Sequence, residues 1–190
     1  MHRFQFLCLC ATIAGLLNAC STEQRRPDDS TSRASGNSAA SRTSEWVVTP
    51  RGLGPIHAGM TRSQAQTALG GSLAIPADSG WNDCAYVSSD RLPPGVSVMV
   101  EDGTIARVEI DSGRIATAEG ARIGDTEDRI RELYRGRVTV TPHKYTDGHY
   151  LSVTSPADSM YRIVFETDGR RVTQYRAGRL PAVDYVEGCA

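Results

Sequence analysis

The sequence predicts an α+β fold of two tandem units, in each of which a helix precedes antiparallel strands and packs on one sheet face. Three observations lead to this prediction. Two distant segments share a glycine, a threonine two positions later and apolar residues spaced as on one helix face. Asp-Gly pairs divide apolar runs at three places, which is a strong signal for β-hairpins. The order that results is a helix followed by a run of antiparallel strands, twice over, and such runs are typical of α+β domains.

Residues 1–19 have the parts of an export signal, because Arg3 precedes a short apolar run that ends in small residues. The run is too short to span a membrane, which takes about 20 apolar residues. The segment Leu17-Asn18-Ala19-Cys20 resembles the lipobox of bacterial lipoproteins. That resemblance implies cleavage before Cys20, a diacylglyceryl group on its thiol and acylation of the freed amine. An ordinary signal peptide with a cysteine at the cut is the alternative.

The lipid would fix the protein to a membrane of the cell envelope. A single acyl chain binds a bilayer only marginally, whereas two or more chains hold stably. By resemblance to lipoprotein sorting in bacteria with two membranes, Ser21 favours the outer membrane. We therefore expect the protein to be anchored in the inner leaflet of the outer membrane, with its folded domain facing the periplasm.

Residues 20–44 are predicted to be the lipidated cysteine and a flexible tether. Serine and threonine dominate 21–44, and nothing apolar larger than alanine is present, so no core can form there. A coil of this length reaches roughly 25–30 Å. The folded domain is expected at 45–190, with repeat units at about 50–115 and 116–178 followed by a C-terminal tail.

Each unit is predicted to begin with a short helix. The first helix follows Gly59-Met60-Thr61, and the second follows Gly124-Asp125-Thr126. Thr61 and Gln64 have the spacing of a capping box, and a glycine stands at the far end of each helix. Two unrelated capped helices could share these features by chance. The apolar face would consist of Ala65, Ala68 and Leu69 in the first helix and Ile130, Leu133 and Tyr134 in the second.

Hairpins are predicted to follow. Asp102-Gly103 and Asp168-Gly169 stand at nearly the same offset in the two units, each between apolar runs. Asp147-Gly148 divides a third pair of runs, 137–145 and 149–154. These correspondences favour an internal duplication over chance.

A family resemblance follows from the start of the first unit. Ile56-His57-Ala58-Gly59-Met60-Thr61, followed by Ala65 and Leu69-Gly70, resembles the Gly-Met-Thr helix start of the SmpA/BamE-like lipoproteins. The tandem arrangement is similar to the β-lactamase inhibitory protein fold, although the second copy reads Gly-Asp-Thr. The resemblance implies a binding protein of the envelope rather than an enzyme, with a protein partner there. It does not decide whether the protein is an assembly scaffold or an inhibitor of an envelope or foreign hydrolase, since a fold does not fix a function.

The strands are expected to present a binding face. Alternation places polar and aromatic side chains on the sheet face away from the helices. Tyrosine and arginine often anchor protein interfaces, although a merely solvated face gives the same pattern. The candidate residues are Tyr150, Arg162, Arg107, Glu109, Met99 and Tyr175.

Two cysteines remain once the signal is removed and Cys20 is lipidated. Cys84 and Cys189 are expected to form a disulfide, because the periplasm is oxidising. The rival hypothesis is a small hydrolase, with Cys84 as nucleophile and His143 or His149 as base, or with both histidines on a metal. Zinc prefers three or four well-placed ligands, and no CxxC or Cys–His spacing occurs.

Charge and motifs exclude other classes of function. The formal net charge is −1, so nothing favours a nucleic-acid partner. The glycine pairs at 52–54 and 70–71 lack the lysine and hydroxyl residue of a phosphate-binding loop. No cofactor and no metal are therefore expected.

Overall fold

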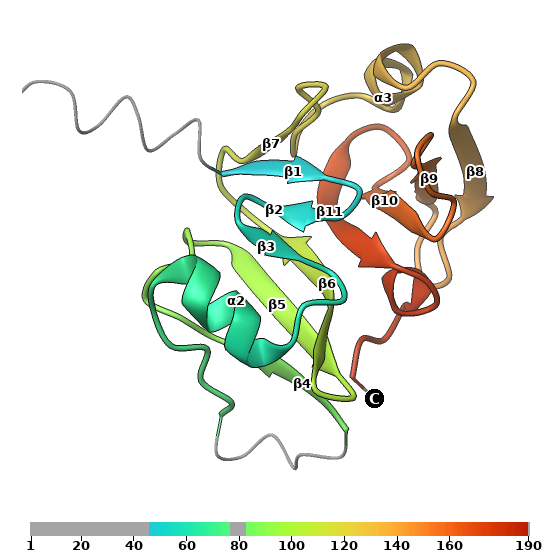
Figure 1. The fold of residues 1–190 in the computed structure, drawn as a ribbon. Helices are drawn as coiled ribbons and strands as arrows, with labels where there is room; N and C mark the ends of the chain where they lie inside the picture. The colour runs from blue at the N-terminus through green and yellow to red at the C-terminus, as the bar shows by residue number, and fades with distance from the viewer. Residues whose placement is uncertain (1–45, 77–82, 190) are drawn as a thin grey trace, which may run out of the picture. The chain divides into compact units, whose positions relative to one another are not determined.

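The computed structural model describes residues 46–76 and 83–189, which form two β-sheets (Figure 1). The predicted signal, Cys20 and the predicted tether lie outside the described residues. The larger sheet is antiparallel, and its strands lie in the order β4 (Cys84–Val87), β5 (Val96–Glu101), β6 (Thr104–Ile110), β11 (Val172–Arg179), β10 (Tyr161–Thr167), β9 (His149–Thr154) and β8 (Val138–Pro142). The smaller sheet has the order β3 (Ile56–His57), β2 (Gly52–Leu53), β1 (Val47–Thr49) and β7 (Ala116–Thr117), with β1 and β7 parallel.

The prediction of two helix-plus-sheet units is wrong. The described residues are mostly β, with two short α-helices, α2 (Arg62–Leu69) and α3 (Glu127–Leu133). β6 pairs with β11, so both groups of strands belong to one seven-stranded sheet. Each helix buries a single apolar residue, Ala65 or Ile130. The smaller sheet, rather than the helices, supplies much of the layer over the larger one.

The local features behind that prediction are nevertheless present. Thr61 and Gln64 form the predicted capping box at the start of α2. Thr61, which caps α2, forms an isolated β-bridge with Thr104, and Thr126, which caps α3, forms one with Arg171. Thr104 and Arg171 each stand just after the turn of a hairpin. In the first hairpin Asp102 and Gly103 have φ of 49° and 75°, as a type I′ turn requires. The two matching segments therefore make matching contacts within one sheet.

The main core lies between the two sheets. Leu53 and Ile56 of the smaller sheet are fully buried against apolar residues of the larger one. Its three largest buried side chains are Tyr134, Phe165 and Tyr175, whose rings contact one another through Phe165. Neither α-helix in the described residues has the length and hydropathy of a membrane span.

A β-bulge changes which residues face this core. Met99 pairs with Arg107, but the next residue, Val100, pairs with Ile105, so Ala106 is an extra residue on β6. Strict alternation would place Ala106 on the same side as Val108 and Ile110; the bulge instead turns Ala106 to the outer face, where it packs on Met99.

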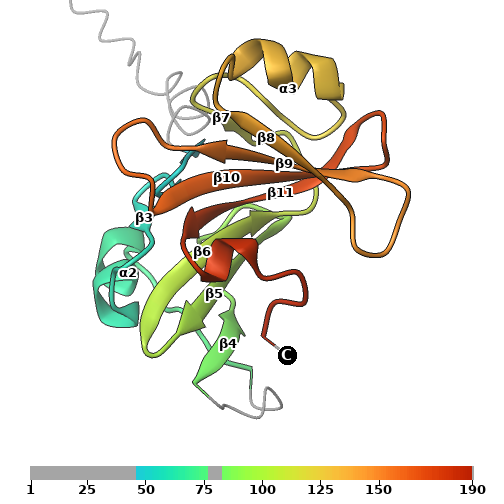
Figure 2. The same cartoon turned by 90° about the vertical axis from the view of Figure 1, so that its right-hand side faces the viewer.

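The C-terminal segment, residues 180–189, crosses that outer face. It contains a 3-10 helix, η1 (Ala182–Asp184), which contacts β6, β10 and β11. Figure 2 shows this segment, in red, in front of the large sheet. A disulfide between Cys84 and Cys189 joins its end to the first strand of that sheet. The predicted C-terminal tail is thus part of the folded domain.

Candidate functional site

Four of the six residues of the predicted binding face are buried. Met99, Arg107, Tyr150 and Tyr175 expose 0%, 2%, 8% and 1% of their surface. Tyr175 is on the core side, where its hydroxyl donates to the Ile115 carbonyl at 2.8 Å. The other three lie on the outer face, but the C-terminal segment covers much of it. The prediction of an open face is therefore wrong for these four residues.

Arg107 is held by the covering segment. Its Nη1 donates to the carbonyl oxygens of Ala182 at 2.7 Å and Tyr185 at 2.6 Å. Its other nitrogens donate to Glu109 and to the hydroxyl of Tyr86. Burial, with help from Glu109, raises the pKa of Tyr86 to about 12. Arg107 and Glu109 therefore use their polar groups in hydrogen bonds within the domain.

A second buried arginine binds the same segment farther along the sheet. Arg176 Nε donates to the Val183 carbonyl at 2.6 Å, and Nη1 pairs with the buried carboxylate of Glu166. Burial alone would raise the pKa of Glu166. Hydrogen bonds from Gln174 and Arg176, with the charge of Arg176, outweigh burial and hold that pKa below its ordinary value. Glu166 is therefore an anion at neutral pH.

Beside this pair, a recess of about 500 Å³ opens on the outer face of β8, β9 and β10, bordered by the C-terminal segment. We call it the hydroxyl recess. Tyr150 and Arg162, from the predicted binding face, both lie in it. Its lining residues are Thr139, Thr141, Pro142, Tyr150, Ser152, Thr154, Arg162, Val164, Arg176, Asp184 and Val186.

The strand register explains why hydroxyl groups gather there. Thr139 pairs with Ser152, and Thr141 pairs with Tyr150, so four side chains share one face in two rows. Thr154 extends β9 on the same face, since side chains two positions apart point the same way. The alternating residues Leu151 and Val153 of β9 point to the core, whereas Val140 of the edge strand β8 is exposed on the other side. The hydroxyl side chains therefore form a continuous surface on the outer face.

Six polar groups of the hydroxyl recess lack partners among the described residues, whereas its charged groups are paired. Among the described residues, the hydroxyls of Thr139, Thr141, Ser152 and Thr154 have no hydrogen-bond partner; Thr139 and Thr141 are exposed, and Ser152 and Thr154 are half-buried. The hydroxyl of Tyr150 and Nε of Arg162 are buried and also have none within that part of the chain. A buried polar group is nearly always hydrogen-bonded. This recess therefore carries unused hydrogen-bonding capacity.

A second recess, of about 680 Å³, adjoins the first and shares Tyr150 and Val186 with it. His143 stacks on Tyr150 there, with 4.5 Å between ring centroids. The Tyr145 amide donates to Nδ1 of His143, so the proton of the neutral ring is on Nε2 and is directed to Glu166 at 3.3 Å. His143 thereby fixes the ring of Tyr150 at the boundary of the two recesses.

The other histidine of the hydrolase hypothesis lies elsewhere. His149 Nδ1 is 2.8 Å from the buried carboxylate of Glu127, which also accepts from Thr167. Burial would raise the pKa of Glu127, but the hydrogen bonds from Thr167, His149 and Arg131 outweigh it and lower that pKa. In the described part of the chain, no group of three or more His, Cys, Asp or Glu residues could hold a metal ion.

The thiol of the hydrolase hypothesis is also engaged. Cys84 is bonded to Cys189, so it offers no thiolate nucleophile in this state. The two sulfur atoms lie where the C-terminal segment meets β4, and the cysteines pack against Met99 and Ala106. The two cysteines therefore serve to attach the segment.

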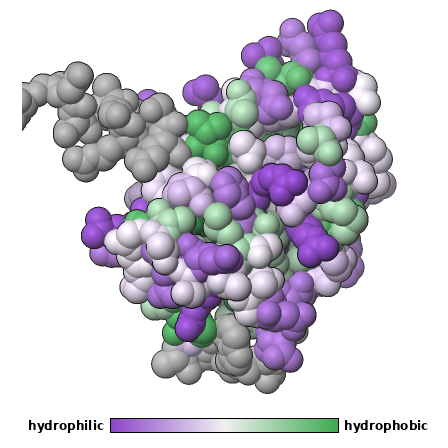
Figure 3. Space-filling view, viewed as in Figure 1, coloured by the Kyte–Doolittle hydropathy of each residue, from purple (hydrophilic) through white to green (hydrophobic). Residues whose placement is uncertain are grey.

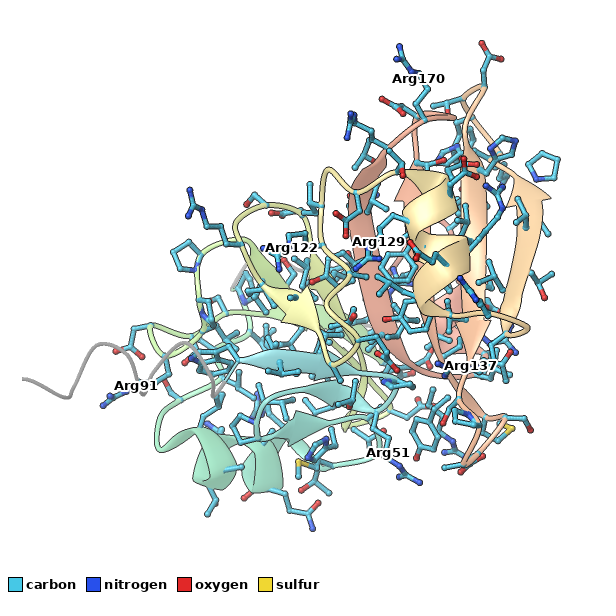
Figure 4. All side chains as sticks on the ribbon, turned by 90° about the horizontal axis from the view of Figure 1, so that it is seen from above. Arg51, Arg91, Arg122, Arg129, Arg137 and Arg170 are labelled. Atoms are coloured by element: carbon cyan, nitrogen blue, oxygen red, sulfur yellow. A yellow bond between two sulfur atoms is a disulfide. The ribbon has the colours of Figure 1, made fainter. Side chains whose placement is uncertain are left out.

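Two further surface features differ from the hydroxyl recess. An apolar hollow of about 440 Å³ lies at the start of β1, where Figure 3 shows hydrophobic side chains; Trp46, Pro93, Pro94 and Ile115 contribute to it. Exposed arginines are spread over separate elements rather than gathered on one face (Figure 4). Neither feature has the converging, unpaired polar groups of the hydroxyl recess, which we take as the candidate site.

Sequence reasoning identified only part of this site. Tyr150 and Arg162 were predicted for a binding face, and Ser152 and Thr154 follow from the same alternation. Thr139 and Thr141 were missed, although Thr-Val-Thr alternates in the same way. The buried pair of Glu166 and Arg176 had no sequence signal, because it depends on which strands are neighbours.

Comparisons with known proteins leave the function open. No family and no curated protein matches the sequence. Among solved structures, the fold is similar to that of the uncharacterized protein yfeY from Escherichia coli, with a TM-score of 0.45 and 13% identity. The match covers 70% of this chain and 99% of that chain. This likeness carries no functional argument, so the proposal below depends on the site and the sequence.

Proposed function

We propose that the chain is a lipid-anchored binding protein of the bacterial envelope that takes a ligand in the hydroxyl recess. The observation that carries this proposal is the hydroxyl of Tyr150, which is buried, lines the recess and has no partner among the described residues. Leaving such a group unpaired costs about 1–3 kcal/mol. A ligand that hydrogen-bonds to Tyr150 would recover this energy.

The sequence supports the envelope as the site of action. The export signal, the lipobox resemblance at Leu17–Cys20 and the tether up to residue 44 favour attachment at a membrane. A disulfide-containing domain fits an oxidising compartment outside the cytoplasm. In this proposal the tether holds the recess within reach of envelope components.

The proposal is tested by photo-cross-linking in intact cells. A photoreactive residue replaces Thr141 at the rim of the hydroxyl recess or, as the matched control, the exposed Ala68 on α2. Adducts are scored by the mass of the purified chain, so that every class of ligand is detected. We expect a discrete adduct from position 141 that Tyr150→Phe weakens. Equal labelling from both positions, or none from 141, would overturn the proposal.

A further inference from the structure

We propose that the ligand of the hydroxyl recess is a neutral saccharide, an inference that rests on the binding function proposed above. The recess presents six polar groups without partners among the described residues: the hydroxyls of Thr139, Thr141, Tyr150, Ser152 and Thr154, and Nε of Arg162. Five of the six are hydroxyl groups. The hydrogen-bonding chemistry of a hydroxyl group therefore decides which ligands this recess can bind.

The hydroxyl groups select for ligands that both donate and accept hydrogen bonds. Each serine, threonine or tyrosine hydroxyl can donate one hydrogen bond and accept others. A carboxylate or phosphate mainly accepts, and an ammonium group only donates, so either would leave part of this capacity unused. The hydroxyls of a sugar have the same dual character as those of the recess. They are the matching partners for such a surface.

The spacing of the groups suits a small cyclic ligand. Thr139 pairs with Ser152 and Thr141 with Tyr150, which sets the side chains roughly 5 Å apart across the strands. Along each strand, equivalent positions repeat about every 7 Å. The hydroxyl groups around a sugar ring can hydrogen-bond to several side chains with these spacings at the same time. The volume of about 500 Å³ is ordinary for a small-molecule site.

The charges around the hydroxyl recess are already balanced. Arg176 pairs with Glu166, and Nη1 of Arg162 lies 3.0 Å from a carboxylate oxygen of Asp184. A phosphate or carboxylate is bound best by a free guanidinium that offers two parallel donors. Both arginines instead have an acidic partner, and Arg176 also donates to a backbone carbonyl. A ligand without net charge fits this balance.

The remaining lining favours a saccharide over a strongly polar ligand such as a salt ion. Val164, Val186 and Pro142 supply apolar surface beside the hydroxyl groups. A sugar ring has apolar C–H faces and polar edges, so it can contact both kinds of surface at once. An extended peptide would instead pair through its backbone with the free edge of β8, which lies beside the recess rather than within it.

The test is an NMR titration of the mature chain, residues 20–190, in which Cys20→Ala removes the lipid. The probes are maltotriose, cellotriose and tri-N-acetylchitotriose, with sodium phosphate and the neutral peptide acetyl-Thr-Val-Thr-Val-Thr-amide for comparison. We expect at least one saccharide to give saturable shifts of the amides of Thr139, Tyr150 and Ser152. Tyr150→Phe should weaken that binding about tenfold, the equivalent of one hydrogen bond.

The control variant is Tyr161→Phe, which removes a tyrosine hydroxyl outside the hydroxyl recess and should leave the affinity unchanged. Tyr150→Phe should not lower the thermal midpoint, since the lost hydroxyl is buried and has no protein partner among the described residues. Stronger shifts with phosphate or the peptide, or none with any saccharide, would overturn the saccharide proposal. A Thr141 adduct in cells would then still uphold the binding function, whereas its absence would remove both.

Discussion

Nη1 of Arg107 donates to the carbonyl oxygen of Ala182 at 2.7 Å, across 75 positions of sequence. The first residue lies at the centre of the large sheet and the second in η1. Arg176 makes the equivalent contact to Val183. Two buried arginines thus bind the backbone of the C-terminal segment, which the disulfide fixes at its end. The segment is therefore part of the core on that face, and it forms one wall of the hydroxyl recess.

Arg107→Met should destabilise the domain by about 3–5 kcal/mol. The substitution keeps the apolar stem but removes the cation that neutralises Glu109 and the donors to the carbonyls of Ala182 and Tyr185. Breaking a buried charged network by removing one member has this cost. Urea denaturation measures the loss. Arg179→Met, at an exposed position of β11, is the control and should change stability by less than about 0.5 kcal/mol. Equal effects of both variants would contradict the role assigned to Arg107.

Removing the disulfide should lower stability without changing the fold. Cys84 and Cys189 are 105 positions apart, and a cross-link over such a loop contributes about 4–5 kcal/mol in the chain-entropy account. We expect a lower urea midpoint for Cys84→Ser with Cys189→Ser, with an unchanged slope, and faster amide exchange in residues 182–186. An unchanged midpoint would show that Arg107 and Arg176 alone hold the segment.

The sequence predicted local features better than long-range ones. The capping box of Thr61 and Gln64 and the Asp102-Gly103 turn each depend on residues a few positions apart, so their signals are complete in the sequence. The two cysteines outside the predicted signal and lipobox had only each other as expected partners. None of these signals states which hairpin lies beside which, and the pairing of β6 with β11 was therefore missed.

The candidate site was predicted in part for the same reason. Alternation along β9 placed Tyr150 correctly on the outer face, but two bulges change the phase on other strands. The extra residue Thr173 moves Tyr175 to the core side and puts Arg176 outside, as Ala106 does on β6. The C-terminal segment has no periodic pattern that would predict its course over Met99 and Arg107.

Acid should unfold the domain through its two buried carboxylates. The pKa values of Glu127 and Glu166 are lowered in the folded state, so their contribution to stability is present above the unfolded value of about 4.3. That contribution is lost as pH falls through the lower folded values. We expect the thermal midpoint to be steady from pH 7 to about 5 and to fall steeply below about pH 4.

Glu166→Gln tests the source of that acid sensitivity. The variant should be less stable at pH 7, by about 3 kcal/mol or more, because Arg176 loses its buried counter-charge. Its midpoint should fall less with acid than that of the unmodified chain, since one of the two carboxylates is gone. Glu132→Gln, at an exposed position on α3, is the control and should keep the original pH profile. An unchanged profile for Glu166→Gln would contradict the assigned role of Glu166.

Cys20→Ala should release the protein from membranes, because the expected acyl chains would have no attachment point and a folded domain alone would not stay bound. Fractionation of cells, with the mass of the N-terminal peptide, measures both location and modification. Cys8→Ala is the matched control, since Cys8 belongs to the expected signal and should leave the protein in the membrane fraction. If Cys20→Ala stays in that fraction, or if the unmodified protein carries a free amino terminus without lipid, the proposed anchoring is wrong. In that case any ligand of the hydroxyl recess would have to be sought among diffusible molecules rather than beside a membrane.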